Sequence, residues 1–293
     1  MNTVSAKSVV ITGASSGIGQ ASVQRMLKAN WHVFATVRQT KDRDRLLSEN
    51  HANLTPILMD VKDRSTIVVA AQQVSAQIEG RGLDGLVNVA GIGIARPLEY
   101  ATPEDVQDIF DINVFGQLIV TQAFLPLIRK ARGRIVNITS VGVHIAIPFG
   151  GLLNGSKSAF GLLSDTLRLE LHPFGIHVCT VEPGAITTPG VEKTLGNIEA
   201  VIAKLPGSGS ARYGAMLRSF AHHAYTREAN GSAPDVVARA IAHALTSPRP
   251  RIRYKAGKGA KLLPAVAGIL PDWLLDKVRL RNLGLPAEFG AMQ

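Results

Sequence analysis

Cysteine is almost absent from this chain of 293 residues: Cys179 is the only one, so no disulfide can form within the chain. Chains without disulfides are typical of reducing compartments, and we expect a cytoplasmic protein. Cys179 lies within the apolar run 176–181, which predicts a buried strand residue rather than a nucleophile or a metal ligand. We therefore expect no metal site.

Linkers, repeats and targeting segments are also missing from the sequence. No Pro/Ser-rich or low-complexity tract divides the chain, and no internal repeat is visible. We expect no signal peptide, because the first strand-like run begins at residue 8 and leaves no room for a basic and then an apolar region. A chain of this length can bury a substantial core, which favours one large α/β domain.

Short apolar runs alternate with amphipathic stretches along the first two-thirds of the chain. The runs cover residues 8–12, 33–37, 54–59, 85–89, 134–138 and 177–181. The amphipathic stretches include residues 65–78, 105–128 and 155–171. This alternation predicts a doubly wound parallel sheet of the Rossmann type, on which ligands bind at the carboxyl ends of the strands. Candidate site residues follow several of the runs, namely Arg38, Asp60, residues 88–91, Ser140 and residues 183–184.

A glycine-rich turn follows the first apolar run, with the sequence Gly-Ala-Ser-Ser-Gly-Ile-Gly at residues 13–19. Gly13 permits a tight turn, Gly17 lets the backbone N–H groups of a helix N-terminus approach a pyrophosphate, and Gly19 allows the helix to pack close to the strand. Many loops between a strand and a helix contain glycines for turn geometry alone. The placement of this turn at the start of a βαβ pattern nevertheless favours dinucleotide binding.

Taken together, these segments resemble the short-chain dehydrogenase/reductase family. The resemblance rests on residues 12–19, Asn-Val-Ala-Gly at 88–91, Asn113, Ser140 after residues 135–139, Lys157, and Pro-Gly-Ala-Ile-Thr at 183–187. It implies an oxidoreductase that transfers a hydride between a nicotinamide and a carbonyl or alcohol. It also implies that Ser140 orients the substrate oxygen, that Lys157 holds the nicotinamide ribose and lowers the pKa of a tyrosine, and that Asn113 supports a proton-relay water.

Position 153, where the resemblance implies that tyrosine, holds leucine. The family's tyrosine lies four residues before the lysine, and the interval from Ser140 to Leu153 also matches the family's spacing. Residues 154–160 still follow the family pattern. An alkyl side chain can neither donate nor accept a proton, and loss of a positioned general acid/base typically costs about 10²–10⁴ in rate. We therefore expect a damaged active site on an intact scaffold.

Three explanations of Leu153 stay open. The chain is an inactivated variant of a working enzyme, a natural member that binds nucleotide without turnover as a sensor or oligomer partner, or an enzyme whose acid/base role has moved to His144. Retention of Ser140, Lys157 and Asn113 favours the first, although Lys157 would still serve ribose binding in the second. The pKa class of a histidine suits the third, but a lone histidine in an apolar loop is more often a packed or substrate-lining residue.

The resemblance also implies which residues contact the cofactor. They are Gly13, Ser15, Ser16, Gly17, Ile18, Gly19, Arg38, Asp60, Val61, Asn88, Ala90, Gly91, Lys157, Pro183, Gly184, Ile186 and Thr187. Among them, Asp60 would contact the adenine, although a carboxylate there could equally cap a helix, and Thr187 would contact the nicotinamide carboxamide. Arg38 ends the second apolar run, where an acidic residue would accept ribose hydroxyls and an arginine suits a 2′-phosphate. With nearby Lys41 and Arg43, it favours NADP(H) over NAD(H), against the alternative of a solvated basic helix start.

The same resemblance implies two functional parts of the chain within a single domain. Residues 1–188 are expected to form the dinucleotide-binding core with the catalytic motifs, and residues 189–293 a substrate loop, the last helix and strand, and a basic, apolar C-terminal cap. The segments expected around the substrate, 92–94, 141–149 and the loop after residue 188, are largely apolar where a pattern is visible. Together with residues 169–175 and 181–184, they resemble the hydroxysteroid and retinol dehydrogenase branch, which implies a lipophilic ketone, aldehyde or secondary alcohol. Family members pair through the helices containing residues 105–128 and Lys157, which implies a homodimer or homotetramer.

The formal net charge is +10, and basic residues concentrate near the C-terminus. No nucleic-acid recognition motif accompanies them and aromatic residues are sparse in the tail, so we expect a solvated basic surface and no nucleic-acid partner. Residues 262–275 are apolar but interrupted by proline, and they are shorter than the ~20 residues that a spanning helix needs. The nearby basic residues and Trp273 allow peripheral membrane contact, but a lid over a lipophilic pocket or a subunit contact is the commoner use of such a segment.

Overall fold

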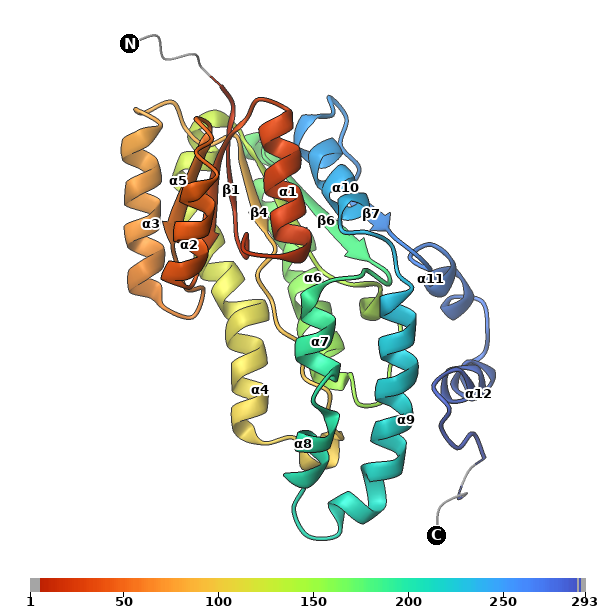
Figure 1. The fold of residues 1–293 in the computed structure, drawn as a ribbon. Helices are drawn as coiled ribbons and strands as arrows, with labels where there is room; N and C mark the ends of the chain where they lie inside the picture. The colour runs from red at the N-terminus through yellow and green to blue at the C-terminus, as the bar shows by residue number, and fades with distance from the viewer. Residues whose placement is uncertain (1–5, 289, 291–293) are drawn as a thin grey trace.

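A seven-stranded, fully parallel sheet is the centre of the computed structural model, which describes residues 6–288 and 290 (Figure 1). The strand order is β3-β2-β1-β4-β5-β6-β7. The chain adds strands on one side of β1 up to β3 and then crosses over to add β4 to β7 on the other side, so the order of the strands, but not their direction, changes between β1 and β4. The strands are β1 (Ser8–Ile11), β2 (His32–Val37), β3 (Leu54–Leu58), β4 (Gly85–Asn88), β5 (Arg134–Ile138), β6 (His177–Pro183) and β7 (Arg253–Ala256). The prediction of a doubly wound parallel sheet is confirmed, and the six predicted runs match β1 to β6.

Helices cover both faces of the sheet and bury its β-branched residues. One face packs against α1 (Gly17–Lys28), α2 (Thr40–Ser48) and α10 (Asp235–Thr246), and the other against α3 (Arg64–Gln77), α5 (Gly116–Ala131) and α6 (Gly151–Leu171). Val9 and Val10, neighbours on β1, point into opposite clusters, as the two-residue period of a strand requires. Cys179 is buried on β6, as its apolar surroundings predicted.

The stretch predicted as one helix over 105–128 is a composite. It comprises α4 (Pro103–Phe110), a π-helical turn η2 (Asp111–Phe115) and then α5. A capping box between Thr102 and Asp105 begins α4. By length and composition alone the whole stretch could cross a membrane. Phe124 and Ile128, however, are fully buried against the sheet, so this stretch contains a core helix of the fold.

Three helices occupy the loop region directly after residue 188, where no sequence pattern predicted a structure. They are α7 (Pro189–Leu195), α8 (Ile198–Ala203) and the long α9 (Gly209–Ala229), and together with α4 they extend beyond the carboxyl ends of the strands (Figure 1). Short 3₁₀ turns η1 (Leu98–Tyr100), η3 (Val141–His144) and η4 (His172–Phe174) complete the connections. After β7, α11 (Leu262–Ala267) and α12 (Asp272–Asn282) lie at the edge of the molecule.

Candidate active site

The glycine-rich turn lies between β1 and the N-terminus of α1. Gly13 and Gly17 have φ angles of +63° and +53°, a conformation that glycine adopts without strain. A Cβ on Gly19 would overlap the Gly13 carbonyl, so only glycine lets α1 pack this closely. Ser16 is the N-cap, but its side chain makes no capping hydrogen bond. Together with the helix N-terminus at Gly17, this narrow turn fits the pyrophosphate of a dinucleotide.

Residues 88–91 continue the site at the end of β4. The hydroxyl of Thr12 accepts hydrogen bonds from the backbone N–H groups of Val89 (2.9 Å) and Ala90 (3.0 Å). A Cβ on Gly13 would lie 2.9 Å from the Cα of Ala90, so the two loops are in close contact. The Thr12 hydroxyl therefore ties together two segments that the sequence assigned separately to the cofactor. Thr12 was part of the motif but was not among the predicted contact residues.

Asn113 lies inside the π-helical turn η2 and is fully buried. Its Oδ1 accepts from the Ile92 N–H (2.9 Å), while its Nδ2 donates to the Ile92 carbonyl (3.0 Å) and to the Ser156 hydroxyl (3.0 Å). π turns inside α-helices are frequent at functional sites because they change the direction in which a side chain points. Here the turn connects the loop after β4 to α6.

Lys157 is the buried cation of the site. Its side chain comes from α6, its Nζ donates to the Ile138 carbonyl at 2.9 Å, and the residue is 8% exposed. A Cβ on Gly91 would lie 3.1 Å from Asn113 Oδ1 and 3.3 Å from Lys157 Nζ, which places both groups beside Gly91. Burial lowers the pKa of Lys157 from 10.5 to about 8. The structure therefore brings Asn113, Lys157 and the loop containing Gly91 together.

Leu153 lies four residues before Lys157 on α6, which places the two side chains on one face of the helix. Leu153 is half-buried. Its alkyl side chain makes no hydrogen bond, and its carbonyl accepts from the Ser156 hydroxyl at 2.8 Å. No proton-transferring group stands at this position.

Ser140 follows β5 and is the N-cap of η3. Its hydroxyl accepts a hydrogen bond from the Gly142 N–H at 3.0 Å. A Cβ on Gly142 would lie 3.2 Å from this hydroxyl and would overlap the Asn154 side chain, so Gly142 keeps the loop close to α6. The hydroxyl hydrogen of Ser140 has no acceptor among the described residues and is free to be donated.

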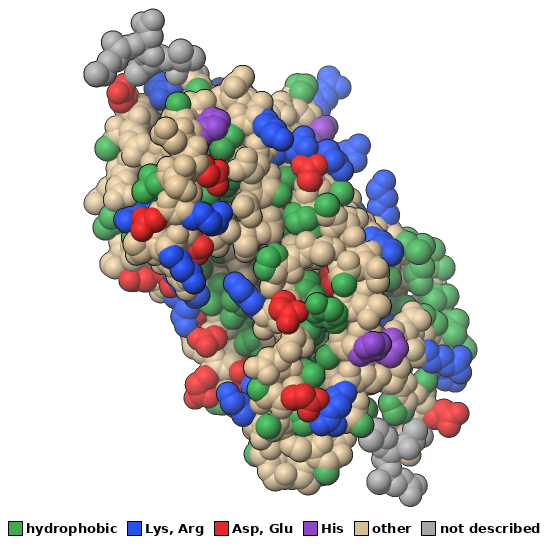
Figure 2. Space-filling view, viewed as in Figure 1, with side chains coloured by type: hydrophobic (Ala, Val, Ile, Leu, Met, Phe, Trp, Pro, Cys, Tyr) green, Lys and Arg blue, Asp and Glu red, His purple; other side chains and the backbone are tan. Residues whose placement is uncertain are grey.

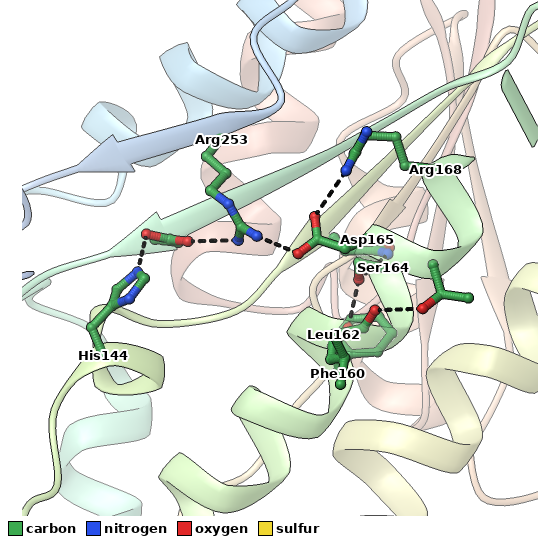
Figure 3. Close-up of polar contacts among 10 residues, drawn as sticks. His144, Phe160, Leu162, Ser164, Asp165, Arg168 and Arg253 are labelled. Atoms are coloured by element: carbon green, nitrogen blue, oxygen red, sulfur yellow. Dashed lines mark hydrogen bonds and ion pairs between the residues drawn. The ribbon is translucent and has the colours of Figure 1, made fainter. Parts of the chain in front are cut away.

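His144 takes part in a different set of contacts (Figure 3). Its Nε2 lies 3.0 Å from Oε2 of the fully buried Glu182 on β6, and Arg253 of β7 donates to the other oxygen of Glu182 at 3.2 Å. Arg253 also pairs with Asp165 of α6. His144 lines a cavity of about 670 Å³ together with Asn154 and other residues, but the residues that line this cavity do not include Ser140, Leu153 or Lys157. In this structure the His144 ring is therefore engaged by Glu182.

The region expected to bind the adenosine end is basic but differs in detail from the prediction. Arg38 is exposed at the end of β2, whereas Arg43 pairs with Asp44 at 2.9 Å. Arg45, which was not among the predicted site residues, donates from α2 to the Ser15 carbonyl at 2.7 Å and so lies against the glycine-rich turn. Only its place in the fold identifies it, since nothing in the local sequence distinguishes it from its basic neighbours.

Asp60 and Val61 follow β3, as expected. The Asp60 carboxylate accepts from the Lys62 N–H at 2.9 Å, and it does not cap a helix: Asp63 is the N-cap of α3. The alternative reading of Asp60 as a helix cap is therefore wrong. Val61 is buried. A Cβ on Gly116 would lie only 2.5 Å from the Val61 carbonyl oxygen, so the absence of a side chain at Gly116 allows α5 to begin beside this loop.

The loop after β6 is held by α9. Ile186 N–H donates to Glu228 Oε2 at 3.1 Å, and the Thr187 hydroxyl lies 3.1 Å from the Glu228 carbonyl and 3.2 Å from that of Ala229. The Thr187 hydroxyl thus donates to the end of α9 in this structure. Pro183 ends β6, and a Cβ on Gly184 would overlap the Lys258 carbonyl, which fixes where the loop begins.

Apolar side chains cover the site from the substrate side. Ala95, Ile147 and Phe149 from the loops after β4 and β5 pack with side chains from α7, α9 and the C-terminal segment. Gly93 lies so close to Thr194 that a Cβ there would be 2.8 Å from the threonine hydroxyl, so α7 lies directly over this loop. The loops after β4 and β5 are therefore covered by apolar side chains from these helices.

The doubly wound fold, the glycine-rich turn and the Asn113–Lys157 arrangement define a dinucleotide-binding oxidoreductase scaffold. The short chain dehydrogenase family matches residues 7–198. The chain belongs to this family.

Individual relatives are similar over nearly the whole chain. Retinol dehydrogenase 5 of Homo sapiens is 37% identical over 291 residues, covering 96% of this chain and 90% of that protein. Among solved structures, a short-chain dehydrogenase from Streptomyces avermitilis superposes with a TM-score of 0.71 at 28% identity, covering 95% of this chain and 97% of the other. An NADPH-bound carbonyl reductase from chicken fatty liver has a TM-score of 0.59 at 29% identity, covering 62% and 81%.

Proposed function

We propose that this chain binds NADP(H) in preference to NAD(H), accepts a lipophilic carbonyl or alcohol, and carries out hydride transfer slowly because Leu153 occupies the position of the proton donor. The observation that carries the proposal is the pairing of Leu153 with Lys157 on one face of α6. A buried lysine with a lowered pKa is retained one helical turn from a side chain that cannot transfer a proton.

The cofactor would be held from three sides. The turn at residues 13–19 would take the pyrophosphate, Asp60 and Val61 the adenine, and Lys157 the nicotinamide ribose. When bound, the nicotinamide supplies or accepts the hydride. The exposed Arg38 and the nearby Arg45 favour a ribose that carries a 2′-phosphate, since a guanidinium donates to phosphate oxygens in a bidentate manner. The similarity to the chicken carbonyl reductase solved with NADPH supports the same choice.

Ser140 would orient the substrate oxygen by donating its free hydroxyl hydrogen. The apolar walls around Ala95, Ile147 and Phe149 favour a lipophilic substrate over a charged one, because a charged group would lose its hydration there. Similarity to a protein named retinol dehydrogenase 5 is consistent with this substrate class. By the family resemblance, Asn113 would support a proton-relay water.

The test is carbonyl-dependent NADPH oxidation by the chain and by Leu153→Tyr over a panel of lipophilic ketones and aldehydes. Leu153→Phe is the matched control, because it supplies the ring without the hydroxyl. We expect Leu153→Tyr to raise kcat/KM by about 10²–10⁴, with Leu153→Phe unchanged and NADPH affinity equal in all three. Equal activity of the chain and Leu153→Tyr would contradict the proposal. In that case loss of activity in His144→Gln would identify His144 as the donor.

A second candidate function is nucleotide binding without turnover, as a sensor or oligomer partner. The retained binding residues around an alkyl side chain at position 153 are what such a protein requires. NADPH binding together with inactivity of both the chain and Leu153→Tyr over the panel would favour this reading.

We also propose a homodimer or homotetramer in the cytoplasm. Leu162 and Leu169 on α6 are 71% and 63% exposed, which gives this helix an apolar surface available for pairing. Sedimentation equilibrium of the chain and of Leu162→Asp tests it, and a chain that is monomeric at all concentrations would refute it.

A further inference from the structure

The C-terminal segment carries an exposed apolar surface that the oxidoreductase site does not use. Leu262 and Leu263 begin α11, Ile269 follows it, and Trp273 lies in the first turn of α12. Their exposed fractions are 67%, 39%, 81% and 64%. We call these four residues the tail patch. α11 buries none of its side chains and α12 buries only Leu275, so these two helices add little to the core of the fold.

Basic side chains border the tail patch. Exposed Lys255 and Lys261 precede it, and exposed Lys277 and Arg281 follow it. Between residues 255 and 281 the sequence has six Lys or Arg against two Asp, which leaves a net charge of +4. Figure 2 shows hydrophobic side chains gathered at the edge of the molecule near α11, with Lys and Arg side chains above and below them. The Lys277 ammonium also lies 5.6 Å from the centre of the Trp273 ring.

We propose that the tail patch docks this protein onto the surface of an anionic membrane. Leucine, isoleucine and tryptophan side chains would enter the boundary between headgroups and acyl chains, where tryptophan is favoured. The flanking lysines and arginines would contact the anionic headgroups. α11 and α12 are too short to span a bilayer, so the contact is peripheral. This inference is independent of the proposed turnover at Leu153.

The charge distribution favours a membrane over a second copy of the chain. In a twofold contact through the tail patch the same surface faces itself, so the basic borders of the two copies would approach one another. Two opposed clusters of like charge raise the free energy of such a contact. An anionic bilayer compensates the same charges.

The two tryptophans of the chain allow a direct test. Trp31 is 5% exposed and Trp273 is 64% exposed, so Trp31→Phe leaves a single fluorophore inside the tail patch. In this background, vesicles of phosphatidylcholine with phosphatidylserine should shift Trp273 emission to the blue, protect it from acrylamide and sediment the protein. Vesicles of phosphatidylcholine alone should bind far less, and high salt should weaken the contact with anionic vesicles.

Variants separate the apolar and the charged contributions. Ile269→Asp should abolish binding, whereas Val69→Asp, a matched change at a 48% exposed residue of α3, should not. The double variant Lys255→Gln, Lys261→Gln should lower the vesicle partition coefficient roughly 25-fold, at about fivefold per charge. The control Lys28→Gln, Lys204→Gln removes the same charge elsewhere. Because these side chains are exposed, each variant should keep the thermal transition of its parent.

Three results would overturn the proposal. One is the absence of binding to anionic vesicles. Another is equal loss of binding in the tail-patch variants and their controls. The third is protection of Trp273 from acrylamide in the absence of vesicles, if this protection is lost when the protein is diluted. That result would instead assign the tail patch to contact between copies of the chain.

Discussion

The buried ammonium of Lys157 makes a prediction about stability against pH. Burial lowers its pKa from 10.5 to about 8. At 1.36 kcal/mol for each pKa unit, this corresponds to about 3 kcal/mol of difference between the folded and unfolded states. The side chain is almost fully buried, so solvent screening reduces this value little.

The sign follows from which state holds the proton. Below pH 8 the lysine is charged in both states, and the cost of burying the charge is fully present. Between pH 8 and pH 10.5 the folded state has released the proton and the unfolded chain still holds it, so the free energy of unfolding rises with pH. Cys179 acts in the opposite direction: burial raises its pKa from 9.0 to about 11, so its contribution to the free energy of unfolding falls between pH 9 and pH 11. The Lys157 contribution must therefore be measured as a difference.

Urea unfolding of the chain and of Lys157→Met, followed by circular dichroism between pH 8 and pH 10.5, isolates the effect. Methionine has a similar length and no titratable group, while Cys179 and the other titrating groups are present in both proteins. The stability of the chain relative to the variant should increase by about 3 kcal/mol across this range. The hydrogen bond from Lys157 to the Ile138 carbonyl adds an offset but not this slope. A difference that is constant with pH would refute the assignment of Lys157 as a group with a lowered pKa.

Three further predictions test single features of the fold and site. Gly155→Ala should stabilise the protein by about 0.5–1 kcal/mol in thermal melts, because nothing lies within 4 Å of its Cβ position in α6. Gly19→Ala should instead destabilise the protein and abolish NADPH binding, because its Cβ would overlap the Gly13 carbonyl. Similar effects of the two changes would contradict this account. Cys179 should react with a thiol reagent only on unfolding, since burial raises its pKa to about 11, and stoichiometric labelling of the folded chain would disprove its burial. Arg38→Asp should lower the ratio of NADPH to NADH affinity by at least about tenfold in a fluorescence titration, and an unchanged ratio would remove Arg38 from the cofactor site.

The sheet could be predicted because its strands are short β-branched runs separated by amphipathic helices. β1 to β6 were visible in this way, but β7 was not: of Arg253–Ala256 only Tyr254 and Ala256 are buried, and the exposed positions carry Arg253 and Lys255. In such a strand at the edge of a sheet only every second residue is apolar, whereas a central strand is apolar on both faces and is easier to recognise in the sequence. Its position depends on pairing with β6, which is a tertiary contact.

The helices α7 to α9 escaped prediction for a related reason. α9 packs through Leu217, Phe220 and Ala224 against side chains from α7, α8 and the loop containing Phe149, while its exposed positions include His222 and His223. Its apolar positions have a helical period, but they become a core only when the neighbouring helices are in place. The contacts of Arg45 with Ser15 and of Thr187 with the end of α9 were invisible for the same reason.

The hydrogen bonds that hold the site together do not involve the side chain of Leu153. Asn88 donates to Asn137 at 2.8 Å inside the core, and Lys157 donates to the Ile138 carbonyl. Leu153 contributes only its carbonyl, which accepts from Ser156, and any residue at this position would provide the same group. Exchange of this half-buried side chain therefore removes none of these hydrogen bonds, so Leu153→Tyr should change the chemistry of the site without changing its framework. For this reason a difference in rate between Leu153→Tyr and Leu153→Phe would report the hydroxyl, and hence the proton transfer, rather than a repaired fold.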